Sequence, residues 1–147
     1  MPELNGLVRI DAPLEVVFAF VDDHRNTTRF LKGLDRWDPL DPEKVQGLGI
    51  RFRGEIKVGP VHLGGVLEVI EHVPLERVAY RSIEGPRLDG VWSFRRDRDR
   101  TVVELRNSFD LPGGIAGRMV GKVIAAQGQK DLQGSLETLK RLVEEGV

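Results

Sequence analysis

The sequence contains no cysteine, which removes several kinds of site from consideration at once. Disulfides, thiolate zinc sites, iron–sulfur clusters and a cysteine nucleophile are all excluded. The chain also lacks an apolar stretch near the ~20 residues that a membrane-spanning helix needs. It begins with neither a basic segment nor an apolar run, so we expect no signal peptide and a cytoplasmic location.

An excess of charge of one sign is missing as well. The chain has 22 basic and 23 acidic residues, which give a formal net charge of −1. This balance offers no electrostatic reason to expect nucleic acid or an anionic membrane as the main partner. A length of 147 residues suits a single domain, residues 1–147, which is large enough to bury a core and still enclose a cavity. Few amides and many charged side chains resemble a heat-adapted composition.

Alternating apolar and polar residues dominate the middle of the chain. This period of two predicts half-buried strands, and short turns with Gly and Pro between them favour an antiparallel meander. The charged run 95–100 is expected to be a hairpin turn. The predicted strands cover residues 4–10, 34–40, 50–58, 61–69, 77–83, 88–94 and 101–109.

Helical patterns flank the predicted sheet. Asp11 can cap a first helix and Pro13 fits its first turn. Apolar residues at helical spacing then give this helix one buried face. A second short helix is expected at 26–31, and a long one at 115–145. The apolar face of the first helix carries Leu14, Val17, Phe18 and Val21.

One face of the long helix changes character along its length. Its C-terminal half presents the large residues Leu132, Leu136, Leu139 and Val143, whereas its N-terminal half presents Gly121, Ala125 and Gly128. Glycine inside a helix costs about 1 kcal/mol relative to alanine. We therefore expect the small residues to leave room for a ligand, with close approach of the sheet as the alternative. Apolar residues off this stripe could form a dimer contact, a ligand-access lip or a membrane-touching surface; they are Ile115, Met119, Val120, Val123 and Ile124.

Several short motifs follow one another in a recognisable order. They are residues 8–18 around Ala12-Pro13, Val21-Asp22-Asp23 with Phe30-Leu31, Gly47-Leu48-Gly49, Tyr80-Arg81-Ser82 with Gly85-Pro86, and Gly90-Val91-Trp92-Ser93-Phe94 with Thr101. In these motifs and in the order of its elements, the chain resembles the START-like (SRPBCC) superfamily. The similar branch is that of polyketide cyclase/dehydrase and lipid transport, which includes coenzyme Q-binding proteins.

The resemblance implies an α+β helix-grip fold. In that fold a curved antiparallel sheet wraps around a long C-terminal helix, two short helices follow the first strand, and a hydrophobic tunnel or pocket is enclosed. It does not imply one activity, because a fold shared by many activities cannot settle function.

Inward-facing residues of the strands and the small stripe of the long helix make up the predicted ligand-binding site. Asn107 is its best polar candidate, because a buried amide without a hydrogen bond costs about 1–3 kcal/mol. It is expected either to orient a ligand carbonyl or hydroxyl together with Tyr80 and Ser82, or to bond to local backbone and water. The predicted site residues are Phe52, Ile56, Leu67, Tyr80, Ser82, Trp92, Phe94, Leu105, Asn107, Gly121, Ala125, Gly128 and Leu132.

Other polar motifs receive a structural interpretation. Asp22-Asp23-His24 is interpreted as a solvated helix end with capping acids, since adjacent helical residues point in different directions and cannot converge on a metal. His62 and His72 are expected at the surface. Gly47-Leu48-Gly49 is not followed by a helix, so it cannot cradle a phosphate. There is no strained Gly-x-Ser-x-Gly elbow. We expect no catalytic residue, no metal and no cofactor.

The leading hypothesis is a protein that binds or carries a hydrophobic small molecule such as a lipid, an isoprenoid or quinone, or a polyketide-like aromatic. The alternative is a cyclase or dehydratase that acts on a polyketide-like substrate in the same cavity, which would need little beyond positioning and one acid or base. Nearly all carboxylates fall on outer faces or turns, so binding is favoured. A third hypothesis is an interaction protein that forms a homo-oligomer or contacts a membrane peripherally.

Overall fold

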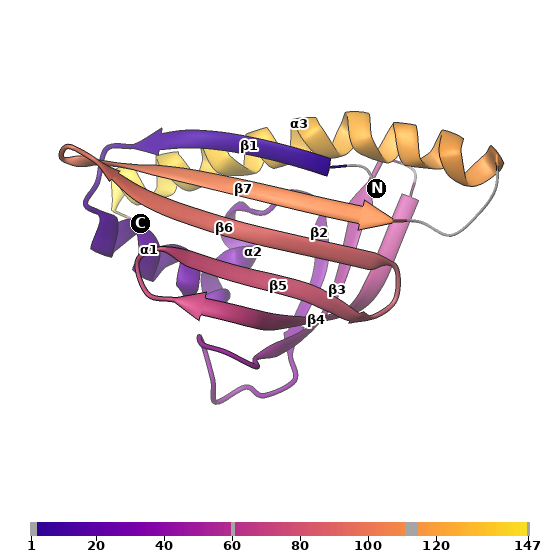
Figure 1. Ribbon diagram of the computed structural model, residues 1–147, viewed down its shortest axis with the longest axis horizontal. Helices are drawn as coiled ribbons and strands as arrows, with labels where there is room; N and C mark the ends of the chain where they lie inside the picture. Colours follow the sequence, from indigo (N-terminus) through magenta and orange to yellow (C-terminus); the bar gives the residue numbers. More distant parts are fainter. Residues whose placement is uncertain (1–2, 60, 111–114, 147) are drawn as a thin grey trace.

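The computed structural model describes residues 3–59, 61–110 and 115–146 (Figure 1). Its main element is an antiparallel sheet with the strand order β1-β7-β6-β5-β4-β3-β2. Neighbours in the sheet are also neighbours in the chain, except where β1 pairs with β7. The strands are β1 (Glu3–Ile10), β2 (Leu34–Pro39), β3 (Arg51–Val58), β4 (Val61–Val73), β5 (Arg77–Glu84), β6 (Arg87–Asp97) and β7 (Arg100–Asp110).

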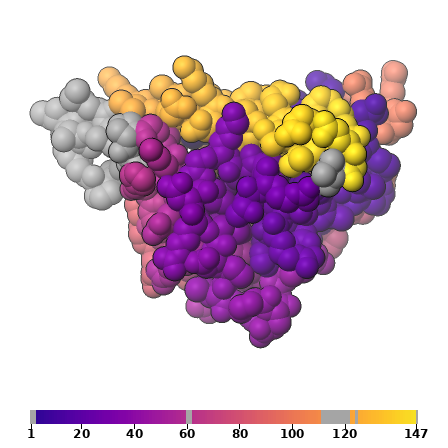
Figure 2. Space-filling model, turned by 180° about the vertical axis from the view of Figure 1, so that it is seen from behind, coloured from indigo at the N-terminus to yellow at the C-terminus, as the bar shows by residue number. Residues whose placement is uncertain are grey.

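Helices cover one face of this sheet. Figure 1 shows the long helix α3 running beside β1. From behind, the indigo-to-purple segment that contains α1 and α2 lies below α3 (Figure 2). The helices are α1 (Leu14–Asp22), the short 3₁₀ helix η1 (His24–Asn26), α2 (Thr27–Phe30) and α3 (Ile115–Glu145). The predicted α+β helix-grip arrangement is confirmed.

The core lies between α3, α1 and the inner face of the sheet. The large apolar face predicted for α3 is buried, with Leu136 and Leu139 fully inaccessible. Gly6 of β1 lets this face come close, because a Cβ there would lie 2.5 Å from Cδ2 of Leu132. The C-terminal half of α3 is therefore fixed against β1, and this contact closes one side of the space under the helix.

Two local predictions need correction. Asp11 does not cap the first helix: the cap position is Pro13, which has no side chain able to accept a bond, and α1 begins at Leu14. The backbone N–H of Asp11 instead donates to the Glu144 carboxylate at 2.7 Å, which ties the start of α1 to the end of α3. The turn predicted at 95–100 is shorter, because β6 and β7 stay paired as far as Asp97 and Arg100, which leaves only Arg98 and Asp99 between the strands.

Within the described part of the chain, no helix is both long enough and apolar enough to cross a membrane. Of the apolar residues off the small stripe of α3, Val123 has a described side chain, which is exposed. The side chains of Ile115, Met119, Val120 and Ile124 lie outside the described residues.

Candidate functional site

A cavity of about 250 Å³ lies between the inner face of the sheet and the helices α2 and α3. Strands from β1 to β7 contribute to its wall, because alternate residues of each strand point to the same face of the sheet. Most of the lining is apolar, and a few polar side chains interrupt it. This composition is typical of small-molecule sites.

Most of the residues predicted to bind ligand meet at this cavity, although their contact with a ligand stays a prediction. The strand residues among them meet there because alternate residues of a strand lie on the same face of the sheet. The predicted residues that line the cavity are Phe52, Ile56, Leu67, Tyr80, Ser82, Trp92, Leu105, Asn107, Gly128 and Leu132.

Three predicted residues stand elsewhere. Phe94 is absent from the described lining and is buried in the core, where it packs edge-on against Phe18 with ring centroids 5.0 Å apart. The reason is that α1 covers this end of β6. Ala125 is half-buried against the core and is likewise not part of the described lining. Gly121 belongs to α3, but its surroundings lie outside the described residues.

Gly128 combines the two explanations proposed for the small stripe. It lines the cavity, and a Cβ at this position would also lie 2.7 Å from Cδ1 of Leu4 on β1. Glycine here therefore permits close approach of helix and sheet at the same place where it borders the cavity. At Gly128, the predicted preference for ligand space over close packing of the helix on the sheet is therefore too simple, because both apply.

The main polar feature of the cavity is a row across three strands. Tyr80 on β5, Gly90 on β6 and Asn107 on β7 are consecutive cross-strand partners. The phenol of Tyr80 crosses β6 and donates to Oδ1 of Asn107 at 2.7 Å. A Cβ on Gly90 would overlap the Tyr80 ring. Glycine at position 90 is therefore what allows the phenol to reach Asn107.

Asn107 thus satisfies its carbonyl oxygen in a way that neither sequence-based alternative included. Its Nδ2 carries two hydrogens, and no described protein group accepts from it. Because Asn107 lines the cavity, this amide can donate to a ligand oxygen. Burial raises the pKa of Tyr80 well above its usual value, so the phenol stays protonated and keeps the Asn107 amide oriented.

Ser82 has a local partner as well. Its Oγ accepts a hydrogen bond from the backbone N–H of Leu88 at 2.9 Å, across the turn between β5 and β6. The hydroxyl therefore holds the end of this hairpin, and its own hydrogen remains available at the cavity wall.

The interpretation of Asp22-Asp23-His24 as a solvated helix end is wrong for two of the three residues. The side chain of Asp22 is 7% exposed, lines the cavity and accepts from Nε2 of His72 at 2.9 Å. His24 is buried against the ring of Phe52. Only Asp23 behaves as a capping acid, since it accepts from the backbone N–H of Arg25.

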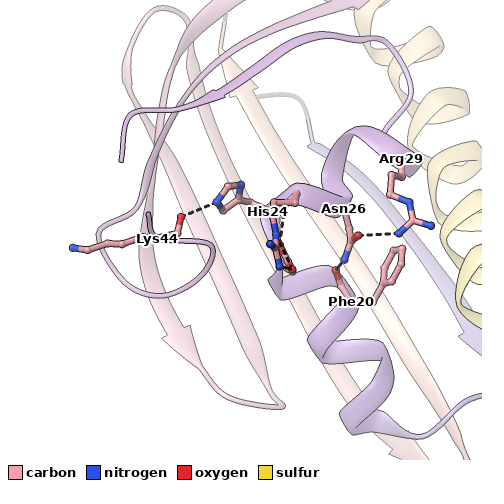
Figure 3. A network of polar contacts seen from close by, with 7 residues as sticks. Phe20, His24, Asn26, Arg29 and Lys44 are labelled. Carbon is pink, nitrogen blue, oxygen red and sulfur yellow. Dashed lines mark hydrogen bonds and ion pairs between the residues drawn. The ribbon is translucent and has the colours of Figure 1, made fainter. Parts of the chain in front are cut away.

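His24 connects the end of α1 to the loop that follows β2. Its Nε2 donates to the Lys44 carbonyl at 2.8 Å (Figure 3). Its backbone N–H donates to the Val45 carbonyl at 3.1 Å. Beside it, Asn26 donates to the carbonyl of Phe20 at 2.9 Å and accepts from Arg29. The loop therefore folds back over the helix end, which is why His24 is buried.

The two remaining histidines differ from each other. The side chain of His62 is 68% exposed, so its predicted surface position is confirmed. His72 is only 16% exposed and lies edge-on to Phe18, so the same prediction is wrong for it. The pattern of β4 could not reveal this, because α1 is what covers the end of that strand. Among the described residues, no group of three or more His, Cys, Asp or Glu side chains is arranged to hold a metal ion.

Two further residues of the site were missed. Trp37 on β2 lines the cavity and stacks on Phe52, with the ring centroids 4.5 Å apart. Its indole N–H is buried and has no acceptor among the described residues. Gly90 belongs to the predicted strand 88–94 but was not among the predicted site residues. A glycine opposite a large aromatic residue in a neighbouring strand was the available signal, both for Gly90 beside Tyr80 and for Gly54 beside Trp37.

Comparisons with known proteins extend these observations. A family model described as polyketide cyclase / dehydrase and lipid transport matches residues 1–144. A search of curated proteins found no match. Among solved structures, a protein of Thermus thermophilus is similar, with a TM-score of 0.84 and 23% identity over 99% of both chains.

Two other similar structures are of proteins named after an activity or a superfamily. An aromatase/cyclase from Streptomyces sp. R1128 has a TM-score of 0.77 and 17% identity, over 98% of this chain and 94% of that one. A START superfamily protein from Mycobacterium smegmatis has a TM-score of 0.75 and 14% identity over 99% of both chains. At such identities, these structures establish a shared fold.

Proposed function

Because the chain belongs to the polyketide cyclase/dehydrase and lipid-transport family, we propose that it binds a mostly apolar small molecule in the cavity beneath α3 and carries or presents it. The observation that carries this proposal is the apolar cavity of about 250 Å³ with the Tyr80–Asn107 pair in its wall. An apolar wall supplies affinity through burial, and a few fixed polar groups supply orientation.

The Asn107 amide is the group proposed to orient the ligand. The Tyr80 hydroxyl donates to Oδ1 of Asn107, so the Nδ2 hydrogens of Asn107 are left to face a bound molecule. A carbonyl oxygen in the ligand would accept from them. An apolar molecule without any acceptor would still bind, but more weakly.

The first experiment is native mass spectrometry of the purified protein, to detect a co-purified small molecule, followed by calorimetric titration with 1-tetralone. Leu67→Trp should fill the cavity from the inner face of β4 and weaken binding at least tenfold. Ile70→Trp is the matched control, because Ile70 lies on the same strand and its side chain is 42% exposed. Equal binding by both variants would argue against ligand binding in this cavity.

The stability of the Leu67→Trp variant adds a second criterion. A new side chain that enters open volume should leave the free energy of unfolding unchanged or raise it. Overpacking a filled interior would lower it by typically 1–3 kcal/mol. Such a loss together with unchanged binding would contradict the proposal.

A second candidate function is a cyclase or dehydratase. Sequence reasoning found no interior acid or base, but Asp22 lines the cavity and is hydrogen-bonded to His72. A carboxylate held in this way could remove a proton from the carbon next to a ligand carbonyl and return it to the β-hydroxyl group, which then leaves as water. The test is whether the wild-type protein, but not Asp22→Asn, accelerates loss of water from a two-ring β-hydroxyketone, followed by mass spectrometry. No acceleration by the wild-type protein would leave binding as the function.

A further inference from the structure

The size of the cavity limits what it can hold, an inference that rests on the proposed function. A dry apolar cavity of roughly 150 Å³ accommodates benzene. By simple proportion, about 250 Å³ accommodates a compact molecule of roughly ten non-hydrogen atoms, which is one or two rings. A diacyl lipid, or a quinone with its isoprenoid tail, is larger than that volume and would have to extend out of the cavity.

A second polar group faces the same space from another wall. Asp22, the last residue of α1, lines the cavity, and one of its oxygens, Oδ1, accepts from Nε2 of His72. Its other oxygen, Oδ2, accepts no hydrogen bond from any described residue. Since His72 fixes the carboxylate, Oδ2 is a positioned acceptor at the cavity wall.

The two polar groups are associated with different strands of the sheet. His72, the partner of Asp22, belongs to β4, whereas Asn107 belongs to β7, three strands away in the sheet. Neighbouring strands lie about 4.8 Å apart, so β4 and β7 are roughly 14 Å apart along the sheet. Trp92 on β6 and Val78 on β5 belong to the two strands between them and line the cavity, so the intervening wall is apolar.

We propose that this cavity selects a compact, one- or two-ring molecule with a carbonyl oxygen at one end and a hydroxyl group at the other. The Asn107 amide donates to the carbonyl, and the Asp22 carboxylate accepts from the hydroxyl. The apolar surface between them holds the rings. His72 is a positioning residue, since it orients Asp22 and does not itself belong to the described lining.

Isothermal titration calorimetry with four probes that share one two-ring carbon skeleton tests this selection. Tetralin has neither polar group, 1-tetralone has the carbonyl alone, and 6-hydroxy-1-tetralone has both groups at opposite ends. The fourth, 8-hydroxy-1-tetralone, has both groups side by side, where its hydroxyl bonds to its own carbonyl. We expect 6-hydroxy-1-tetralone to bind about tenfold or more tightly than either 1-tetralone or the 8-hydroxy isomer, since a hydrogen bond to a charged group contributes this much.

Two variants test whether Asp22 is responsible for the tighter binding of the 6-hydroxy compound. In Asp22→Asn the amide oxygen can keep the bond from His72, which leaves an NH₂ group, a donor, where the carboxylate accepted. The advantage of the hydroxyl should then fall to about onefold, while 1-tetralone binding changes little. Asp23→Asn removes the same charge from the neighbouring residue, which is not part of the described lining, and should keep the advantage.

The outcomes separate this inference from the proposed function. If no probe binds, both fail. If tetralin and the ketones bind but the 6-hydroxy compound has no advantage in the wild-type protein, only the two-anchor selection fails, whether or not Asp22→Asn folds. Persistence of the advantage in Asp22→Asn would also overturn it. Tighter binding of a dipalmitoyl phospholipid than of every probe would overturn the size limit.

Discussion

At the scale of single residues, Tyr80 is held by its neighbours on both sides. Gly90 leaves space for its ring, and Asn107 accepts from its hydroxyl. The phenol is therefore partly buried in the cavity wall while it remains hydrogen-bonded, which is how a polar ring is accommodated in an apolar wall. Two predictions follow from this arrangement.

The first prediction concerns ionisation. Tyr80 is the chain's single tyrosine, so tyrosinate absorbance at 295 nm reports this residue alone. Burial raises its pKa, whereas the unfolded chain ionises it near pH 10. The native protein should therefore show no tyrosinate at pH 10, and its free energy of unfolding should decrease as the pH rises above 10. Half-ionisation near pH 10 in the native protein would show that the phenol is open to water.

The second prediction concerns Gly90. Gly90→Ala places a methyl group where the Tyr80 ring lies, so the ring must move and its bond to Asn107 must break. We expect a loss of about 1–3 kcal/mol in the free energy of unfolding, measured with urea.

Gly64→Ala on β4 is the matched control, because its Cβ would make only ordinary contacts, the nearest at 3.4 Å. It should not destabilise the protein. In a Tyr80→Ala background, Gly90→Ala should also cost much less, and an unchanged cost there would mean that the ring is not the obstacle.

At the scale of elements, the short helices matter because they bring polar groups to the cavity. The end of α1 supplies Asp22, and η1 supplies His24 against Phe52. The loop after β2 is then fixed by the hydrogen bonds from His24 to Lys44 and Val45. One residue thus couples the covering helices to the loop at the edge of the sheet.

The third prediction tests this coupling by proteolysis. Trypsin can cut after Lys44, but the carbonyls of Lys44 and Val45 both accept from His24 in the native fold. His24→Ala should increase the rate of cleavage between Lys44 and Val45, because local opening then requires fewer broken contacts. His62→Ala, which changes an exposed histidine, should leave the rate unchanged. Equal rates in both variants would show that other contacts hold the loop.

At the scale of the whole molecule, the cavity lies between parts of the chain that are far apart in sequence. β1 and α3 close one side, the long strands form the floor, and α1 to α2 cover the inner face (Figures 1 and 2). A molecule bound there would contact most of these elements together. Binding should therefore stabilise the domain as a unit.

The fourth prediction is a thermal shift. A ligand that binds only the folded state stabilises it by about 2.7 kcal/mol at a concentration of 100 times its Kd. For a domain of this size, we expect 1-tetralone at that concentration to raise Tm by about 5–10 °C. Differential scanning calorimetry measures the shift. The Leu67→Trp variant should show little shift at the same concentration, and an equal shift would place the binding site elsewhere.

The sequence by itself determined the strands, the long helix, the buried apolar face of α3 and the face of the strands that lines the cavity. The reason is that burial of one face imposes a period of two on strands and a helical period on helices. Asn107 and Tyr80 could be found in this way because both stand on inner rows, and the resemblance of the ordered motifs supplied the arrangement of sheet and helix.

The tertiary structure alone decided which partners the polar residues found. The carboxylate of Asp22 accepts a hydrogen bond from His72, which lies 50 residues further along the chain. The phenol of Tyr80 reaches Asn107 only because position 90, between them in the sheet, is a glycine. Phe94 shares the alternation of Trp92, yet α1 covers it and leaves Trp92 at the cavity. Periodicity shows which face a residue is on, but what covers that face depends on contacts between distant segments, which no local pattern contains.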